Sequence, residues 1–176
     1  MNTVLTNPAN LSNAVLTPTE NWTLATIGDP ITPFHVEPQG KIAGDVNTGM
    51  YSIFARFVLP AFTSGTYINS ADFILHAESD AEGSYPLSVY VIANTWQVRD
   101  MTRDNVPRAS GTPVLSFTVA NGQDARLDLT EVVDAAYRGD GVITLLVTNA
   151  QFQHNIQNFA PAKALNISVS GPSAAP

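Results

Sequence analysis

The strongest constraint on the fold of this chain lies between residues 50 and 92, where apolar side chains fall on every second position in three consecutive segments. Such alternation predicts β-strands that bury one face and expose the other. Residues 61–67 are short enough for a hairpin-like connection between the first two segments. The apolar positions are Ile53, Ala55, Phe57, Leu59, Ala71, Phe73, Leu75, Leu87, Val89 and Val91.

Further elements follow along the chain. Residues 114–119 alternate in the same way, and the Asn121-Gly122 pair is a strong signal for a hairpin turn into a return strand over residues 125–129. Residues 142–148 are apolar at nearly every position, which predicts a central strand covered on both sides. Residues 165–169 make a last alternating strand.

One short helix is predicted between these strands. Its start can be capped by Asp128 or Thr130, and Gly139 can close its end. The apolar side chains recur with helical spacing. They are Leu129, Val132, Val133, Ala136 and Tyr137.

Together these elements predict an all-β fold, an antiparallel β-sandwich of jelly-roll type with one short helix. The polar, Asn-rich residues 1–13 are interpreted as an N-terminal arm, residues 14–170 as the sandwich domain and residues 171–176 as a C-terminal tail. A chain of 176 residues with 44% hydrophobic content is large enough to bury one core of its own.

Composition excludes several function classes. The chain has no cysteine, so disulfides and thiolate chemistry are excluded. The net charge of -7 argues against a nucleic-acid partner, because such binding needs clustered Lys and Arg. No stretch reaches the ~20 apolar residues of a membrane span, and the residues after Met1 lack the pattern of a secretory signal. We therefore expect no nucleic acid and no membrane partner.

Four sequence pieces resemble a known family. They are residues 55–59, residues 68–75, residues 89–91 followed by Trp96, and residues 127–130 leading into Val132 and Val133. In this order they resemble the DNRLRE (disaggregatase-related) β-sandwich modules, which are similar to family 96 carbohydrate-binding modules. The resemblance implies a non-catalytic module of the kind found in polysaccharide-acting enzymes, cell-surface proteins and virion proteins.

Catalytic and metal-binding signatures are absent from the sequence. No GxSxG, HExxH, CxxC, GxGxxG or P-loop occurs, so we expect no enzyme activity and no cofactor. The histidines share no ligand spacing and are interpreted as solvated. They are His35, His76 and His154. The carboxylates of Glu78, Asp80 and Glu82 could hold calcium, but a solvated acidic turn explains them better.

The tripeptide Arg138-Gly139-Asp140 spells an integrin-type motif. A cation in the last helical turn, a glycine at the helix end and an aspartate in the next turn are also what helix termination requires. We favour the structural interpretation.

A candidate partner surface lies on the outward side of the three alternating segments. If these strands pair as neighbours, the outward residues point away from the core together, and such an apolar and aromatic face should be covered. The cover could be residues 28–49 or the short helix, or else a sugar or a partner protein. The outward residues are Phe54, Arg56, Asp72, Ile74, His76 and Tyr90.

A second candidate surface lies in the connection over residues 94–112. Arg99, Arg103 and Arg108 could clamp an acidic polysaccharide or an acidic subunit, since guanidinium groups match carboxylates. Alternatively, these arginines pair with the neighbouring aspartates. Trp96 either contributes to this surface or pins the connection into the core.

Two functions compete on the sequence. The first is a structural or decoration module of a virion or other surface assembly, which contacts other subunits or copies of itself. It is narrowly preferred, because the Met1 start, the missing signal and the polar ends suit an assembled particle. The alternative is a carbohydrate-binding module of a secreted polysaccharide-active enzyme, with an acidic polysaccharide as ligand. Either places the protein at a virion or extracellular surface.

Overall fold

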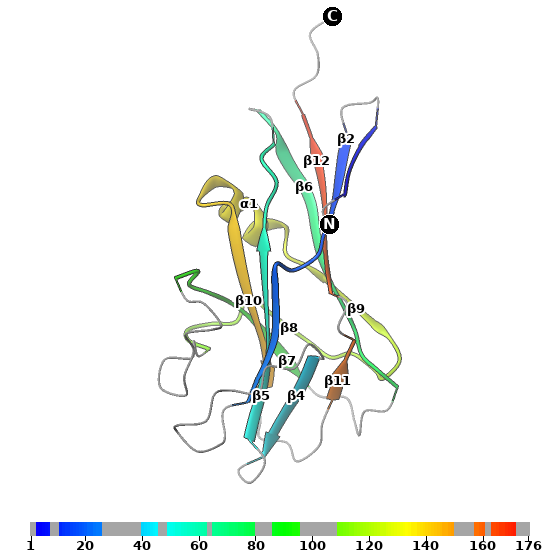
Figure 1. Cartoon of the computed structure of the whole chain (residues 1–176), viewed down its shortest axis with the longest axis vertical. Coiled ribbons are helices and arrows are strands. Elements are labelled where there is room, and N and C mark those ends of the chain that lie inside the picture. Colours follow the sequence, from blue (N-terminus) through cyan, green and yellow to red (C-terminus); the bar gives the residue numbers. More distant parts are fainter. Residues whose placement is uncertain are drawn as a thin grey trace, which may run out of the picture.

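A computed structural model describes residues 3–7, 11–25, 40–45, 49–62, 65–79, 86–95, 109–149, 157–160 and 163–171. Within these ranges the chain forms strands and one helix, α1 (Thr130–Arg138) (Figure 1). The strands are β1 (Thr3–Asn7), β2 (Leu11–Leu16), β3 (Glu20–Ala25), β4 (Gly40–Asp45), β5 (Gly49–Val58), β6 (Tyr67–His76), β7 (Leu87–Ile92), β8 (Leu115–Phe117), β9 (Asp124–Asp128), β10 (Val142–Asn149), β11 (Gln157–Phe159) and β12 (Ala164–Ser170).

The strands form two antiparallel sheets. The five-stranded sheet has the order β1-β2-β12-β6-β9. The seven-stranded sheet has the order β11-β4-β5-β10-β7-β8, and β3 also pairs with β5. The predicted antiparallel β-sandwich with one short helix is therefore confirmed, and its jelly-roll subtype stays a prediction from the sequence.

The three alternating segments do not pair as neighbours. β5 and β7 flank β10 in the seven-stranded sheet, whereas β6 lies between β12 and β9 in the five-stranded sheet. The expected neighbour pairing is wrong because alternation reports only that one face of a strand is buried. Strands of both sheets bury that face in the same core, so both show the same pattern.

The turn at Asn121-Gly122 is present, but it does not close a hairpin. Gly122 adopts a φ of 73°, in the left-handed region that favours glycine, and its N–H donates to the carbonyl of Ala77 at 2.8 Å. The preceding strand β8 pairs with β7, and the following strand β9 pairs with β6. The turn therefore carries the chain from one sheet to the other.

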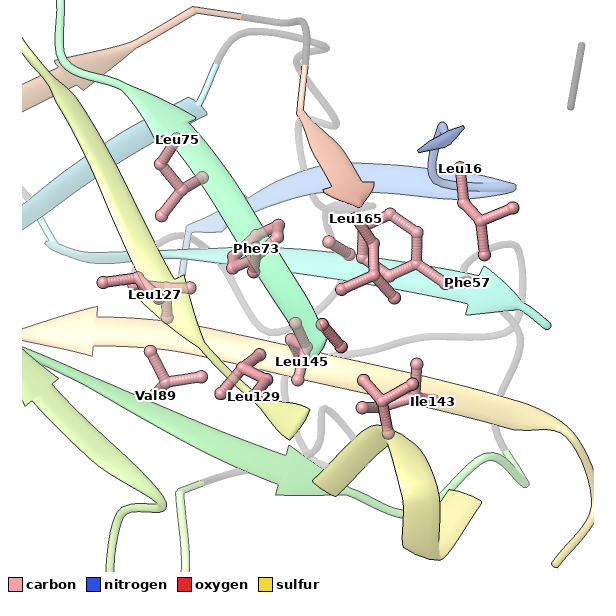
Figure 2. Close-up of a cluster of buried hydrophobic side chains, with 14 of the residues drawn as sticks. Leu16, Phe57, Phe73, Leu75, Val89, Leu127, Leu129, Ile143, Leu145 and Leu165 are labelled. Atoms are coloured by element: carbon pink, nitrogen blue, oxygen red, sulfur yellow. The ribbon is translucent and has the colours of Figure 1, made fainter. Parts of the chain in front are cut away.

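The hydrophobic core lies between the two sheets (Figure 2). Phe57 of β5 and Phe73 of β6 are both fully buried, and their rings meet edge to face with centroids 5.8 Å apart. Because the two strands belong to different sheets, this pair joins the two layers. Strand β10 is buried from Ile143 to Asn149, which confirms the prediction of a central strand covered on both sides.

The N-terminal region differs from the expected arm. Residues 3–7 form β1, and residues 11–13 form the beginning of β2. β2 pairs with β1 on one side and with β12 on the other, so its backbone hydrogen-bonding groups have partners in both directions. The pairing of β1 with β2 was not predicted, because the region is rich in asparagine, which is uncommon in strands.

Helix α1 contacts β6 of one sheet and β10 of the other. The carboxylate of Asp128 accepts hydrogen bonds from the hydroxyl and the N–H of Thr130 at 2.6 and 3.0 Å, and these bonds lower the pKa of Asp128. The Thr130 hydroxyl accepts the N–H of Ala71 on β6 at 3.0 Å, and Val133 is buried in the core. Because the helix buries its apolar side between the sheets, it does not cover the outward row at Phe54 as one sequence alternative proposed.

Candidate functional site

The candidate site is the outer face of the seven-stranded sheet. Ile53, Ala55 and Phe57 of β5 point into the core, so Phe54 and Arg56 occupy the opposite face. The adjacent strand β10 carries polar residues on this face, although it is buried from Ile143 to Asn149. Side chains from β5, β10, β7 and β8 form three rows across this face.

The first row is apolar. Phe54 lies opposite Leu146 in the register of β5 and β10, and Leu146 lies opposite Tyr90 in the register of β10 and β7. Residues directly opposite each other in antiparallel strands share a face, so these three side chains form one row, called here the apolar row. Beyond Phe54, Trp22 of β3 takes the opposite register position.

The second row carries hydroxyl groups and is called here the hydroxyl row. Ser52 donates its hydroxyl proton to the Thr148 hydroxyl at 2.9 Å. Thr148 lies opposite Ser88, and Ser88 lies opposite Ser116, with 3.2 Å between the two serine hydroxyls. The row therefore continues from β5 to β8.

The third row is polar and is centred on Arg56. Its Nη1 lies 3.4 Å from Oε1 of Glu20, and its Nε donates to the Thr144 hydroxyl at 3.3 Å. Its Nη2 donates to the backbone carbonyl of Asn94 at 3.4 Å. Only 12% of the Arg56 side chain is exposed, so the guanidinium group is held by the protein rather than by solvent.

Asn94 connects this group to the end of α1. Its side-chain oxygen accepts the Thr144 hydroxyl proton at 2.8 Å, and its amide nitrogen donates to Val142 O at 3.0 Å and to Asp140 Oδ2 at 3.1 Å. The hydrogen bonds from the N–H of Val142 and from Asn94 lower the pKa of Asp140. We call the linked residues the Arg56 cluster. They are Glu20, Arg56, Asn94, Asp140 and Thr144.

Replacing Arg56 with glutamine is expected to lower the free energy of unfolding by about 1–2 kcal/mol. The shorter side chain removes the cation beside Glu20 and the donors to Thr144 and Asn94. Urea unfolding would measure the loss. The control is Arg126→Gln, since Arg126 pairs with Asp72 on an exposed face and exposed pairs contribute little. Equal unfolding midpoints for the two variants would contradict the role assigned to Arg56.

The predicted outward surface is split between the two sheets. Phe54, Arg56 and Tyr90 lie on the outer face of the seven-stranded sheet. Asp72 and His76 belong to β6 and lie on the opposite side of the sandwich, where they pair with Arg126 at 2.6 Å and with Asp124 at 2.7 Å. Ile74 also belongs to β6. The single surface is wrong because it assumed that β5 and β6 were neighbours.

Phe54 is not a surface residue. It is 2% exposed, and Leu146 beside it is 2% exposed. The expectation that the outward row must be covered therefore holds at its centre. Trp96, Arg99, Arg103 and Arg108 lie outside the described residues.

The other sequence candidates have structural roles or fall outside the described part of the chain. Among the described residues, no group of three or more His, Asp or Glu side chains is arranged to hold a metal ion. Asp80, Glu82, His35 and His154 lie outside the described residues.

The Arg138-Gly139-Asp140 tripeptide makes intramolecular contacts. Arg138 pairs with Asp134 at 2.8 Å, one helical turn earlier. The N–H of Gly139 donates to Ala136 O at 3.0 Å, which closes the last turn of the helix. Asp140 belongs to the Arg56 cluster. These contacts support the helix-termination interpretation.

Sequence reasoning missed three members of the Arg56 cluster, Glu20, Asn94 and Thr144. A weak signal existed for Thr144, since a hydroxyl in an otherwise apolar central strand needs a hydrogen-bond partner. Nothing in the sequence connected Glu20 or Asn94 to Arg56, because both contacts depend on strand pairing between distant segments.

The fold and this face define a β-sandwich module. Its outer surface carries the apolar row between the hydroxyl row and the Arg56 cluster. The family model of carbohydrate-binding module family 96 matches residues 13–166. The chain therefore belongs to carbohydrate-binding module family 96.

Two further comparisons add little. No curated protein matches the chain. Among solved structures, the chain is similar to the coat protein in the structure of the Tobacco streak virus coat protein dimer, with 11% identity and a TM-score of 0.40. That match covers 98% of this chain and 93% of the coat protein chain. The similarity is too low to support an inference.

Within the described part of the chain, no helix is long and apolar enough to cross a bilayer.

Proposed function

We propose that this chain is a non-catalytic carbohydrate-binding module that binds an acidic polysaccharide through the outer face of the seven-stranded sheet. The observation that carries the proposal is the family match over residues 13–166. An extracellular or surface location follows from this role. The finer resemblance to DNRLRE modules stays an interpretation.

The composition of the face supports a sugar ligand. Sugar rings present apolar C–H faces and a rim of hydroxyl groups, so they suit sites that combine aromatic side chains with hydrogen-bonding groups. The outer face offers such a combination where it is accessible, at the half-buried Tyr90 beside the exposed Ser116.

An acidic ligand is favoured by the basic residues that follow this face in the sequence. Asn94 belongs to the Arg56 cluster, and Arg99, Arg103 and Arg108 come shortly after it in the chain. On a protein of net charge -7, these three arginines are three of only eight basic residues. Guanidinium groups bind carboxylates in a bidentate manner, which suits a polymer of uronic acids.

The virion or decoration role now ranks second. The family match favours binding of polysaccharide over assembly with other subunits, although one module can be carried by a surface assembly. Contacts with other subunits or with copies of this chain stay a prediction.

Binding can be measured by calorimetry and affinity electrophoresis with alginate and polygalacturonate, and with cellulose and mannan as neutral comparisons. The protein is expected to bind an acidic polymer, with an affinity that falls as salt is added. Replacing Arg99, Arg103 and Arg108 together with alanine is expected to weaken binding about tenfold or more.

The control replaces Arg126 with alanine, because Arg126 is an exposed arginine on β9 of the other sheet. This control should bind like the unaltered protein. Binding to no polysaccharide would contradict the proposed function. Binding that is equal for both variants would contradict the acidic ligand and leave a neutral one.

A further inference from the structure

The apolar row becomes accessible only at one end. Phe54 on β5 and Leu146 on β10 are each 2% exposed, whereas Tyr90 on β7 is half-buried. Exposure therefore rises across the face from β5 toward β8. A ligand can therefore contact the apolar row at Tyr90, whereas Phe54 is buried.

The hydroxyl row shows the same gradient. Ser52, Thr148 and Ser88 are buried, whereas Ser116 on β8 is exposed. Ser116 lies opposite Ser88, and their hydroxyl oxygens are 3.2 Å apart. The accessible end of this row is therefore next to β7, on the same side of the sheet as Tyr90.

The Tyr90 side chain also makes no hydrogen bond and no ring contact with any described residue. A buried or half-buried tyrosine usually has a partner for its hydroxyl group. Among the described residues this ring has no such partner, and it lies beside the exposed Ser116. This edge is therefore suited to a ligand that offers both a C–H face and hydroxyl groups.

Resting on the proposed function, we propose that the β7–β8 edge of the outer face is a sugar-binding subsite for one ring of the polysaccharide. Tyr90 stacks against the ring, and the exposed Ser116, whose hydroxyl oxygen lies 3.2 Å from that of buried Ser88, exchanges hydrogen bonds with its hydroxyl groups. The polymer approaches the sandwich at β8 and does not lie over β5. This assigns specificity to residues that the family match does not identify.

The subsite can be tested with the polysaccharide that the unaltered protein binds. Tyr90→Ala is expected to weaken binding about tenfold, because the stacking surface is lost. Tyr90→Phe keeps the ring and should lose no more than a few-fold. Ser116→Ala is expected to weaken binding about three- to fivefold, because one hydrogen-bonding group is lost.

Tyr67→Ala is the matched control, because Tyr67 is a tyrosine with 63% exposure on β6 of the other sheet. It should bind like the unaltered protein. Thermal unfolding of each variant shows whether the fold is retained, and Tyr90→Phe and Ser116→Ala keep the test valid if Tyr90→Ala does not fold.

The two proposals fail in different ways. If the unaltered protein binds a polysaccharide while Tyr90→Ala and Ser116→Ala bind it within twofold of the same affinity, the subsite is wrong and the proposed function stands. If the unaltered protein binds none of the polymers, the proposed function and the subsite are both rejected. Equal loss in Tyr67→Ala and Tyr90→Ala would also reject the subsite.

Discussion

Replacing Phe73 with alanine is expected to lower the free energy of unfolding by about 3–5 kcal/mol. The side chain is fully buried on β6, and its ring meets the Phe57 ring of the opposite sheet edge to face at 5.8 Å. The substitution removes apolar contacts to both layers and leaves a cavity between them. Urea unfolding followed by far-ultraviolet circular dichroism would measure the loss.

A second substitution at the same position tests the prediction if the Phe73→Ala variant does not fold. Phe73→Leu keeps most of the volume and is expected to cost about 1–2 kcal/mol. Phe62→Ala serves as the comparison, because Phe62 is only half-buried and packs on Tyr137 with ring centroids 5.3 Å apart. If Phe73→Ala cost no more than Phe62→Ala, the pairing of the two sheets through Phe57 and Phe73 would be wrong.

The alternation predicts correctly which residues of β5 and β6 face the core. It is wrong for Val91 of β7, which is 46% exposed, and it does not predict which sheet a strand joins. Phe57 and Phe73 were both assigned correctly to buried faces, yet their strands were expected to be neighbours. Alternation has the same period in both sheets, and the Asn121-Gly122 turn has the same local chemistry whether it closes a hairpin or crosses the core. Only long-range pairing distinguishes these cases.

The site was predictable only in part, for the same reason. Arg56 and Tyr90 were identified because a charged residue and an aromatic residue stand on the outward side of alternating strands. Their separation from His76 could not be predicted, since it depends on strand order. The burial of Phe54 agrees with the expectation that an apolar, aromatic row is covered. The link from Asn94 to Arg56 joins segments 38 residues apart, and no local pattern indicates it.

Lys163, just before β12, carries a buried amine that we did not predict from the sequence. Leu165, Ile167 and Val169 of β12 point into the core at every second position, and Lys163 continues that series just before the strand begins. It is 2% exposed, and its Nζ donates to the Ala160 carbonyl at 3.2 Å. Within the described residues no carboxylate lies within ion-pairing distance of it. Burial lowers the pKa of Lys163 to about 8.

Replacing Lys163 with methionine is therefore expected to stabilise the fold by about 2–3 kcal/mol near neutral pH. Methionine keeps the length of the side chain and removes the charge that burial disfavours. The gain should depend on pH. Between a folded pKa of about 8 and the ordinary value of 10.5, the unfolded chain holds a proton that the folded chain has released. The unaltered protein consequently gains stability relative to the variant as pH rises through this window.

The measurement compares urea unfolding of Lys163→Met and the unaltered protein at about pH 7, 9 and 10.5, where the difference between them isolates this one group. The stability gap is expected to be largest at the lowest pH and to shrink steadily at the two higher values. Lys163→Gln, which is also uncharged but polar, should show the same pH trend with a smaller gain. A gap that stays constant with pH, or a variant less stable than the unaltered protein, would mean that the amine is solvated or paired in the folded chain. The burial of Lys163 at the start of β12 would then be incorrect.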